Sequence, residues 1–288
     1  MIIVTGANGQ LGRAIVEKLV ERVSASQVGA SVRDPAKASD LAALGVLVRQ
    51  GDFDDLASLI HAFEGAAQVL IVSSNAAAYG GDPLAQHRAA IEAAREVGAT
   101  RIVYTSHMGA SHASLFPPMR DHMATEDMLR QSGLAWTALR NGFYASSGLF
   151  LMGNALKTGV IEAPADGKVS WTAHADLAEA AAIILADDGR YEGPTPPLTG
   201  SQALALADLA ALASELQAQP VRRQIISDED LRAKMVARGL PERVAEISLG
   251  LYRASREGEF AAVDLALARL LGRSPIPLKD LIAAKIGG

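Results

Sequence analysis

The segment Met1–Gly12 limits what this chain can fold into more than any other segment. An apolar run leads directly into Gly6, Gly9 and Gly12, and the amphipathic stretch Arg13–Arg22 follows. Glycine at these places permits a tight turn, a close approach of backbone amides to a pyrophosphate, and close packing of the helix on the strand. The helix N-terminus adds free N–H groups and a partial positive charge. The segment therefore predicts a phosphate-binding turn rather than an ordinary one. The predicted contacts are Gly6, Ala7, Asn8, Gly9, Gln10, Leu11 and Gly12.

Short apolar runs alternate with helical patterns along the first half of the chain. The predicted strands are Ile2–Thr5, Val28–Val32, Val46–Arg49, Val69–Val72, Arg101–Thr105 and Ala135–Leu139. The predicted helices are Gln10–Arg22, Pro35–Leu44, Asp55–Phe63, Leu84–Val97 and Met119–Gln131, with a further one at His174–Ala186. Such alternation predicts an α/β fold with a doubly wound parallel sheet of the Rossmann type, which binds its ligand at the carboxyl ends of the strands.

After about residue 140 the pattern loosens into segments that carry glycine and proline, and then becomes mainly helical. We expect a dinucleotide-binding domain over residues 1–140, joined by a returning segment near 168–200, and a smaller, mainly helical substrate lobe over 141–288. The apolar stretches Leu249–Tyr252 and Leu265–Leu271 either complete this lobe or form a homodimer surface. Both alternatives stay open at this point.

The composition excludes several classes of function. With 288 residues and 49% hydrophobic side chains, the chain can bury a large core. A net charge of −5 and a pI near 5.7, without a run of like charge, argue against a nucleic-acid partner. The lack of cysteine excludes disulfides and thiolate metal sites, and the histidines show no metal-binding pattern. Because no apolar run could span a bilayer, we expect a cytoplasmic protein with no membrane partner.

Two basic residues lie near the end of the second predicted strand. Enzymes that prefer the unphosphorylated dinucleotide place an acid there, roughly 20 residues beyond the glycine turn, to bind the ribose hydroxyls. This chain has Arg33 instead, followed by Lys37 one helical turn later. A guanidinium can form paired, charge-assisted hydrogen bonds to a 2′-phosphate, so NADPH is favoured over NADH. The alternative is that Arg33 is a solvated cation paired with the neighbouring Asp34.

Two further loops follow predicted strands and can line the same site. After the third strand, Asp52 can accept a hydrogen bond from the adenine amino group while Phe53 lines the pocket wall. The alternative is that Asp52 or Asp54 caps the next helix. After the fourth strand, hydroxyl and amide groups can contact the nicotinamide ribose, although the polarity of a surface loop would explain them nearly as well. These residues are Ser73, Ser74 and Asn75.

Several motifs are spread along almost the whole chain. They are VTGANGQLG at the N-terminus, VRDPAK, GDFDD, the YTS of Tyr104–Ser106, the LRNGFY of Leu139–Tyr144 and the later HADLAEAAA. With these motifs the chain resembles the NmrA-like branch of the atypical short-chain dehydrogenases, and within it the NADPH-dependent quinone oxidoreductase and triphenylmethane-dye reductase group. The resemblance implies an oxidoreductase that binds NADPH on a Rossmann-type sheet. It adds as cofactor contacts Thr105, Ser106, Asn141, Gly142 and Phe143.

One departure from the wider family bears on the reaction. Ordinary short-chain dehydrogenases use a Tyr-x-x-x-Lys pair, in which lysine lowers the tyrosine pKa so that the hydroxyl can protonate a carbonyl oxygen. Residues 117–126 of this chain read PPMRDHMATE, so the pair is absent, and Asp121 stands where many NmrA-like enzymes have lysine. Simple ketone reduction is therefore disfavoured. Hydride addition to a quinone gives a stabilised anion that water can protonate, and addition to a cationic triarylmethane carbon requires no proton.

The expected activity is direct hydride transfer from NADPH to a quinone or to a similar conjugated or cationic aromatic acceptor, with no flavin and no metal. The protein would hold the nicotinamide against a flat acceptor and exclude water. The same NmrA-like branch also contains regulators that bind the dinucleotide without turning it over. A non-catalytic NADP(H)-sensing protein is therefore the alternative.

Candidate residues around the acceptor follow from the resemblance. Aromatic and methionine side chains suit a planar acceptor, although Phe143 and Met108 could equally be core residues. The candidate catalytic residues are His122 and Tyr144. His122 lies four residues before Glu126 on one helix face, so it is either a proton donor with an orienting carboxylate or half of an ordinary surface pair. The expected substrate contacts are Tyr79, His107, Met108, Phe143 and Tyr144.

Overall fold

The computed structural model describes residues 1–187, 189 and 191–287. Within this part the chain forms two compact units, each built from several segments. The first unit contains residues 1–107, 121–140 and 174–196, and the second contains residues 108–120, 141–173 and those from 197 onward. The expected boundary near residue 140 is thus accompanied by an excursion of residues 108–120 into the second unit. The alternation of strands and helices gave no sign of this excursion.

A seven-stranded sheet forms the centre of the first unit, in the order β10-β6-β5-β4-β1-β2-β3. The strands are β1 (Ile2–Thr5), β2 (Val28–Val32), β3 (Leu47–Gln50), β4 (Gln68–Ile71), β5 (Arg101–His107), β6 (Ala135–Asn141) and β10 (Gly193–Pro194). The recorded strand pairs of this sheet are parallel. The chain order reverses between β1 and β4, which is the switch point at which open α/β sheets bind ligands. The predicted doubly wound parallel fold is confirmed.

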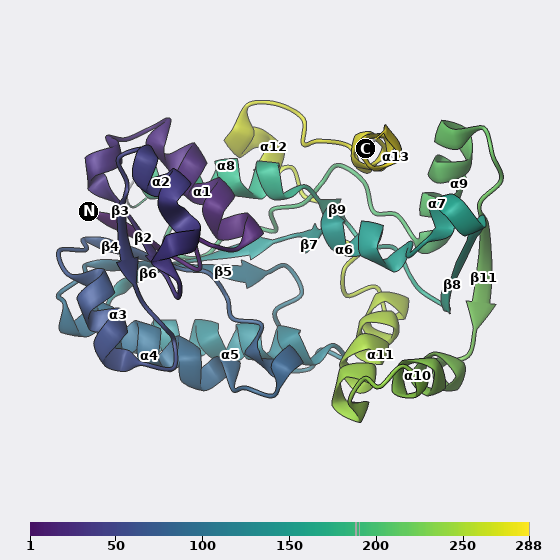
Figure 1. The fold of residues 1–288 in the computed structure, drawn as a ribbon, viewed down its shortest axis with the longest axis horizontal. Helices are drawn as coiled ribbons and strands as arrows, with labels where there is room; N and C mark the ends of the chain where they lie inside the picture. Colours follow the sequence, from purple (N-terminus) through teal and green to yellow (C-terminus); the bar gives the residue numbers. More distant parts are fainter. Residues whose placement is uncertain (188, 190, 288) are drawn as a thin grey trace. The chain divides into compact units, whose positions relative to one another are not determined.

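Helices cover both faces of this sheet (Figure 1). α1 and α8 pack against each other on one face, while α3 and α4 pack together on the other. The helices are α1 (Gln10–Val20), α2 (Ser39–Ala43), α3 (Leu56–Phe63), α4 (Pro83–Glu96), α5 (Pro117–Gln131) and α8 (His174–Ala186), with 3₁₀ turns η1 (Ala25–Gln27), η2 (Pro35–Ala38) and η3 (Ala76–Tyr79). The residues of α5 from Asp121 onward belong to this unit.

Acidic residues start several of these helices. Asp55 and Asp82 accept hydrogen bonds from the first backbone N–H groups of α3 and α4, and Asp34 caps η2. The predicted strands and helices of this unit are confirmed, and their ends shift by two residues or fewer. One prediction is wrong in detail. The continuous helix expected over 35–44 is divided into η2 and α2, because Ala38 leaves helical geometry with φ −123°.

Two short parallel ribbons and a set of helices make up the second unit. β7 (Phe143–Tyr144) pairs with β9 (Trp171–Thr172), and β8 (Val160–Pro164) pairs with β11 (Arg222–Ile226). The helices are α6 (Ala145–Leu151), α7 (Ala155–Thr158), α9 (Leu206–Gln217), α10 (Asp228–Ala237), α11 (Glu242–Arg256), α12 (Ala266–Leu271) and α13 (Leu278–Gly287). The unit is mainly helical, as expected for the C-terminal lobe.

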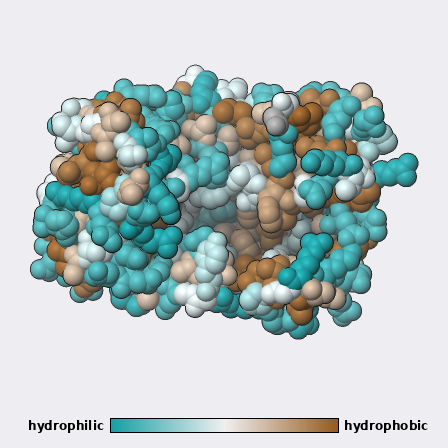
Figure 2. Space-filling view, in the orientation of Figure 1, coloured by the Kyte–Doolittle hydropathy of each residue, from teal (hydrophilic) through white to brown (hydrophobic). Residues whose placement is uncertain are grey.

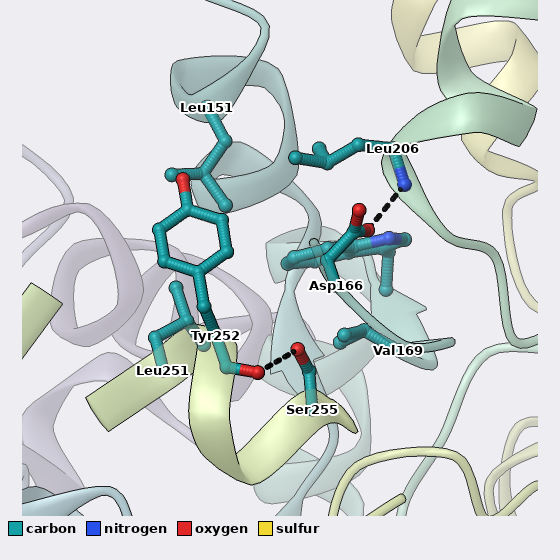
Figure 3. A pocket seen from close by; sticks show the side chains of 8 residues that line it. Leu151, Asp166, Val169, Leu206, Leu251, Tyr252 and Ser255 are labelled. Carbon is teal, nitrogen blue, oxygen red and sulfur yellow. Dashed lines mark hydrogen bonds between the residues drawn. The ribbon is translucent and has the colours of Figure 1, made fainter. Parts of the chain in front are cut away.

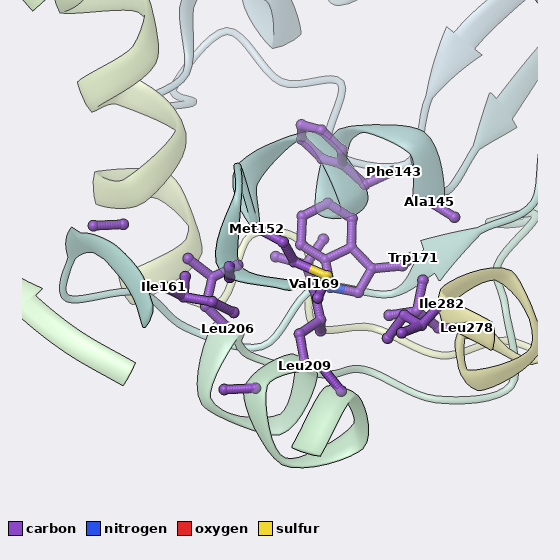
Figure 4. Packing of buried hydrophobic residues seen from close by; sticks show 14 of the residues in the cluster. Phe143, Ala145, Met152, Ile161, Val169, Trp171, Leu206, Leu209, Leu278 and Ile282 are labelled. Atoms are coloured by element: carbon purple, nitrogen blue, oxygen red, sulfur yellow. The ribbon is translucent and has the colours of Figure 1, made fainter. Parts of the chain in front are cut away.

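The second unit has an aromatic core of its own. The ring of Phe143 meets Trp171 and Phe260 edge to face, with centroid distances of 5.4 and 5.1 Å. Each such pair contributes about 0.5–1.5 kcal/mol beyond the burial of area. Figure 4 shows Phe143 and Trp171 among the aliphatic side chains of this cluster. Tyr252, from the apolar stretch 249–252, belongs to the same cluster, so at least this side chain completes the lobe.

Some hydrophobic side chains stay at the surface. Leu44 and Leu47, the second of which begins the edge strand β3, are 49% and 37% exposed, and in the second unit Phe150 of α6 is 80% exposed. Figure 2 shows hydrophobic surface over both places. Among the described helices, none combines the length and the apolar character that crossing a bilayer demands.

Candidate functional site

The glycine turn after β1 has the geometry that a pyrophosphate requires. Gly6 adopts φ +61°, in the left-handed region, and its carbonyl oxygen accepts a hydrogen bond from Gly9 N at 2.8 Å. A Cβ at Gly12 would lie 2.5 Å from that same oxygen, so only glycine lets α1 pack this closely on the turn. α1 begins at Gln10, and no side chain caps its first N–H groups. These donors and the helix dipole are available to an anion.

Side chains from the turn and from α1 hold the loop after β2. Asn8 Nδ2 donates to Asp34 O at 2.9 Å, and an Arg13 guanidinium nitrogen donates to Lys37 O at 2.9 Å. The Asp34 carboxylate lies 3.4 Å from Lys37 Nζ. The alternative in which Asp34 pairs with Arg33 is therefore not what the structure shows. Arg33 is exposed at the end of β2, with no recorded hydrogen bond or ion pair to the described residues.

The acidic residues of the loop after β3 shape that loop themselves. Asp52 Oδ1 accepts from Asp54 N at 3.1 Å, and Asp52 N donates to Ser58 Oγ at 2.9 Å. Asp55 caps α3, accepting from two backbone N–H groups of the first turn at 3.1 and 3.2 Å. The alternative in which Asp52 or Asp54 caps this helix is therefore wrong. The adenine contact of Asp52 and Phe53 stays a prediction.

Side chains from two other elements hold the loop after β4. Ser73 N donates to Thr105 Oγ1 of β5 at 2.8 Å. Ser74 N donates to His87 Nε2 of α4 at 2.9 Å. Asn75 is exposed. The structure thus brings together two predicted cofactor contacts, Ser73 and Thr105, and adds His87 to them.

Aromatic side chains gather at the carboxyl end of β5. The hydroxyl of Tyr104 lies 2.8 Å from His122 Nδ1, and the rings of His107 and His122 stack with centroids 6.0 Å apart. Burial lowers the pKa of His107 to about 3. Burial, with smaller contributions from His107 and His87, holds the pKa of His122 well below its ordinary value. Both imidazoles are therefore neutral at neutral pH.

The predicted pairing of His122 with Glu126 is wrong. Glu126 is fully buried, and its oxygens accept from Ser106 Oγ at 2.6 Å and from two Arg140 nitrogens at 3.1 and 2.8 Å. A buried carboxylate needs a charge partner, and Arg140 supplies it with paired hydrogen bonds. The hydrogen bond of His122 goes to Tyr104 instead. The cofactor contact of Ser106 stays a prediction, but its hydroxyl already donates to Glu126.

Backbone hydrogen bonds hold the NGFY segment in the second unit. Asn141 O accepts from Met108 N at 2.8 Å, and Gly142 N donates to Leu198 O at 2.7 Å. A Cβ at Gly142 would lie 2.2 Å from Thr172 Oγ1, so glycine is required at this position. The segment is therefore fixed tightly, and the predicted cofactor contacts of Asn141 and Gly142 stay predictions.

The side chains predicted to contact the acceptor differ in their burial. Phe143 is 8% exposed in the aromatic core, in agreement with the alternative that it is a core residue. Burial raises the pKa of Tyr144 to about 12, against a smaller opposing effect of a hydrogen bond with Asn141. Met108 is half-buried, and its Sδ accepts from Ser170 Oγ at 3.1 Å. In the first unit His107 is 8% exposed, whereas Tyr79 is 83% exposed.

A small cavity lies inside the second unit (Figure 3). Asp166 accepts from Leu206 N at 2.7 Å beside it, and Ser255 Oγ donates to Tyr252 O at 2.9 Å. Its volume of about 10 Å³ is enough for one water molecule but not for an aromatic acceptor. Nor do three or more His, Cys, Asp or Glu side chains gather as metal ligands within the described residues.

Two residues of the site were not predicted from the sequence: His87 and Arg140. His87 did leave a signal, because it lies four residues after Pro83 on the face of α4 that also buries Ile91. A histidine on an apolar helix face implies a buried polar contact. Arg140 of β6 left no such signal, because its partner Glu126 lies on α5 and the two meet only when the chain folds.

Comparison with known proteins identifies the family. Residues 6–188 match a family described as NAD(P)H-binding. The chain belongs to this family. Quinone oxidoreductase 2 of Escherichia coli (strain K12) is 37% identical over 284 residues, which cover 98% of this chain and 98% of that protein.

Solved structures extend the similarity to the whole fold. The NADPH-dependent quinone oxidoreductase of Escherichia coli, crystallised with NADPH, is 36% identical with a TM-score of 0.91, over 99% of both chains. The triphenylmethane reductase of Citrobacter sp., complexed with NADP(H), is 34% identical with a TM-score of 0.88, over 99% of this chain and 100% of that one. The resemblance to the quinone oxidoreductase and triphenylmethane reductase group is confirmed.

Proposed function

We propose that this NAD(P)H-binding protein is an NADPH-dependent oxidoreductase that transfers a hydride directly to a quinone or to a similar conjugated or cationic aromatic acceptor. The glycine turn carries the proposal, because Gly12 packs where no side chain fits and the first N–H groups of α1 have no side-chain cap and could bind an anion. The full-length similarity to a quinone oxidoreductase crystallised with NADPH supports NADPH as the dinucleotide. The similarity to a triphenylmethane reductase supports an aromatic acceptor.

We assign the residues at the strand ends to separate parts of NADPH. The turn Gly6–Gly12 would hold the pyrophosphate, and Arg33 would bind the 2′-phosphate from its exposed position after β2. Lys37 would add a weaker contribution, because Asp34 lies 3.4 Å from its ammonium group. When bound, NADPH supplies the hydride, so no flavin or metal is needed for the transfer.

The lack of a good proton donor among the candidate side chains favours the proposed acceptors. A ketone would give a strongly basic alkoxide, which needs a nearby acid. His122 is neutral because its pKa is well below the ordinary value, and Glu126 already pairs with Arg140. The pKa of Tyr144 is about 12, so this hydroxyl is a weak acid. An acceptor whose reduced form is a stabilised anion, or which starts as a cation, does not depend on these groups.

The acceptor contacts remain part of the proposal. Met108 and Tyr144 of the second unit are half-buried, which suits side chains that touch a ligand. Phe143 lies in the aromatic core, so it would act by supporting its neighbours. His107 and the exposed Tyr79 are also proposed as acceptor contacts.

An assay of NADPH oxidation tests the proposal. The purified protein, without added flavin, is mixed with NADPH and a panel of small quinones and cationic triarylmethane dyes under anaerobic conditions. We expect turnover well above the buffer rate, and an absorbance spectrum of the protein without flavin bands. Calorimetry with NADPH alone is run in parallel. Binding without turnover of any acceptor would contradict the enzyme and favour a sensor, and the absence of binding would contradict the NADPH site itself.

A further inference from the structure

We propose that His87 and Gln86, neighbours on α4, are positioning residues for dinucleotide binding that together hold Ser74 in the loop after β4. This role rests on the NADPH site proposed above, in which Ser73 and Ser74 contact the nicotinamide ribose. Neither His87 nor Gln86 is itself a proposed contact of NADPH. They fix the backbone and the hydroxyl of Ser74 before the dinucleotide arrives.

The loop after β4 begins where the strand-to-strand hydrogen bonds of the sheet end. Its first backbone N–H groups donate to side chains instead. Val72 N donates to Thr5 Oγ1 of β1 at 2.9 Å. The next N–H group, that of Ser73, donates to Thr105 Oγ1 of β5 at 2.8 Å. The third consecutive N–H group, that of Ser74, donates to α4 rather than to a strand. The position of the loop is therefore set by side chains, and the contact to α4 is the last of the three.

The His87 ring has a fixed hydrogen-bond direction. Its Nε2 accepts from Ser74 N at 2.9 Å, so this nitrogen carries no proton and Nδ1 donates to Thr125 Oγ1 at 2.8 Å. The Thr125 hydroxyl then donates to Asp121 O at 2.8 Å. Burial lowers the pKa of His87 to about 4, so the accepting nitrogen persists at neutral pH.

Packing holds the His87 ring as firmly as its hydrogen bonds do. The ring is 1% exposed, and the ring of Tyr104 meets it edge to face with centroids 5.2 Å apart. A buried imidazole is stable only when its polar atoms are paired, and here both nitrogens are. His87 is therefore a rigid support for the amide of Ser74.

Gln86 binds the side chain of the same serine. Ser74 Oγ donates to Gln86 Oε1, and Gln86 Nε2 donates to both carboxylate oxygens of Asp54 at 2.9 and 3.0 Å. Asp54 belongs to the loop after β3 that carries Asp52 and Phe53, the proposed adenine contacts. Gln86 thus links the loop proposed for adenine with the loop proposed for the nicotinamide ribose. Because Asp54 is exposed, we expect a smaller effect from Gln86 than from His87.

Two substitutions of His87 separate its two hydrogen bonds. In His87→Gln the amide oxygen can take the place of Nε2 and accept from Ser74, whereas in His87→Asn the shorter amide can reach Thr125 but not Ser74. We expect His87→Asn to raise the Kd and the KM for NADPH about tenfold, with a smaller change in kcat. We expect His87→Gln to rescue most of this loss. Calorimetry with NADPH gives Kd without any turnover.

Thr125→Val is the matched control for a merely structural effect. It removes the other partner of the His87 ring and leaves the contact to Ser74 in place. We expect it to lower thermal stability as much as His87→Asn does, while the Kd for NADPH changes less than twofold, roughly the scatter of neutral substitutions. Equal Kd values for His87→Asn and wild type, or an equal rise of Kd in Thr125→Val, would overturn the role of His87. If wild type itself bound no NADPH, the proposed function would fail together with this role.

A double-mutant cycle tests the link through Gln86. We expect Gln86→Leu and Asp54→Ala each to raise the KM for NADPH about threefold, and the double variant to raise it no further, because both break one chain of hydrogen bonds. Additive effects in the double variant, or no effect of Gln86→Leu, would overturn the role of Gln86. The turnover of a saturated enzyme serves as the control for general damage.

Discussion

The two compact units hold their candidate functional residues in different ways. In the first unit, buried polar side chains such as Thr105 and His87 hold backbone amides of the loop after β4. In the second unit, Phe143 is held by the rings of Trp171 and Phe260. Hydrogen bonds depend on protonation state and direction, whereas ring packing depends on shape. The first unit should therefore respond chiefly to charge and to acid pH, and the second chiefly to changes in volume.

Each unit contains its own fluorescent reporter. The chain has two tryptophans, Trp136 in the first unit and Trp171 in the second, and both are buried. In the Trp171→Phe variant, fluorescence reports the unfolding of the first unit. In Trp136→Phe it reports that of the second. This pair of backgrounds lets the units be compared under identical conditions.

The largest effect should come from breaking the buried ion pair of the first unit. In Glu126→Ala, Arg140 loses its partner and Ser106 loses its acceptor, so we expect the free energy of unfolding to fall by about 3–5 kcal/mol. Urea unfolding in the Trp171→Phe background measures it. Glu126→Gln, which keeps the shape of the side chain, should lose less. A fall below about 1 kcal/mol for Glu126→Ala would mean that polar contacts do not dominate this unit.

The two units should also lose stability at opposite ends of the pH range, the first in acid and the second in alkali. The pKa of His87 is about 4 in the folded chain against an ordinary 6.5, so the unfolded chain takes up a proton first as the pH falls. Its contribution is fully present above pH 6.5 and is lost as the pH falls toward 4, at a cost of up to about 3 kcal/mol. His107 and His122 add to this loss, because burial lowers their pKa values too.

In the second unit the corresponding groups are tyrosines. Burial raises the pKa values of Tyr144 and Tyr252 to about 12 from the ordinary 10.0, so the unfolded chain loses its protons first as the pH rises. Stability is therefore lost between pH 10.0 and about 12, by up to about 3 kcal/mol for each group. Urea unfolding across pH in the two single-tryptophan backgrounds measures both limits. His87→Gln should reduce only the acid loss of stability, and Tyr252→Phe only the alkaline loss. A reduced alkaline loss in His87→Gln, or a reduced acid loss in Tyr252→Phe, would contradict the comparison.

The same difference explains how far the sequence predicts this molecule. The strand positions, to within two residues, and the glycine turn at Gly6–Gly12 depend on neighbours within a few residues, and both were predicted. The pairs Glu126–Arg140 and His87–Ser74 join separate elements, so they depend on strand order and helix register, which local patterns do not contain. The pairing of β8 with β11 is non-local in the same way. The pairing of His122 with Glu126, predicted from their helical spacing, is wrong for this reason, because Glu126 pairs with Arg140 on β6.

A steric test should separate cofactor binding from packing. Gly12→Val places side-chain atoms against the Gly6 carbonyl, where a Cβ alone would lie 2.5 Å from the oxygen, so we expect NADPH affinity to fall about 100-fold or more. Gly148→Ala is the counterpart in the second unit, with a Cβ 3.0 Å from the Trp171 ring. It should destabilise that unit by about 1 kcal/mol and leave the affinity unchanged. Calorimetry measures the NADPH affinity, and Trp171 fluorescence measures the stability of the second unit. A change of both quantities in both variants would contradict this separation.

Removing the charge of Arg33 should affect the first unit alone, and the loss of NADPH affinity should be smaller than in Gly12→Val. In Arg33→Ala, the proposed guanidinium contact with the 2′-phosphate is lost, so we expect the Kd for NADPH to rise about tenfold while that for NADH is unchanged. Lys37→Ala should have a smaller effect, because Lys37 already pairs with Asp34 at 3.4 Å. Both dinucleotides are titrated by calorimetry. Equal changes in the Kd values for NADPH and NADH would show that Arg33 does not bind the 2′-phosphate.

The smallest expected difference concerns His122, and it tests whether the polar network of the first unit supplies protons or only geometry. Because its pKa lies well below the ordinary value, His122 is a neutral imidazole at neutral pH and therefore a weak acid, and its hydrogen bond goes to Tyr104. In His122→Ala we expect turnover with a quinone and with a cationic dye to fall by the same factor, about tenfold or less. His122→Asn, which can still bond to Tyr104, should recover part of it. A loss of about 100-fold confined to the quinone would instead assign His122 as the proton donor, since the dye requires no proton, and an undiminished rate with both acceptors would remove it from catalysis.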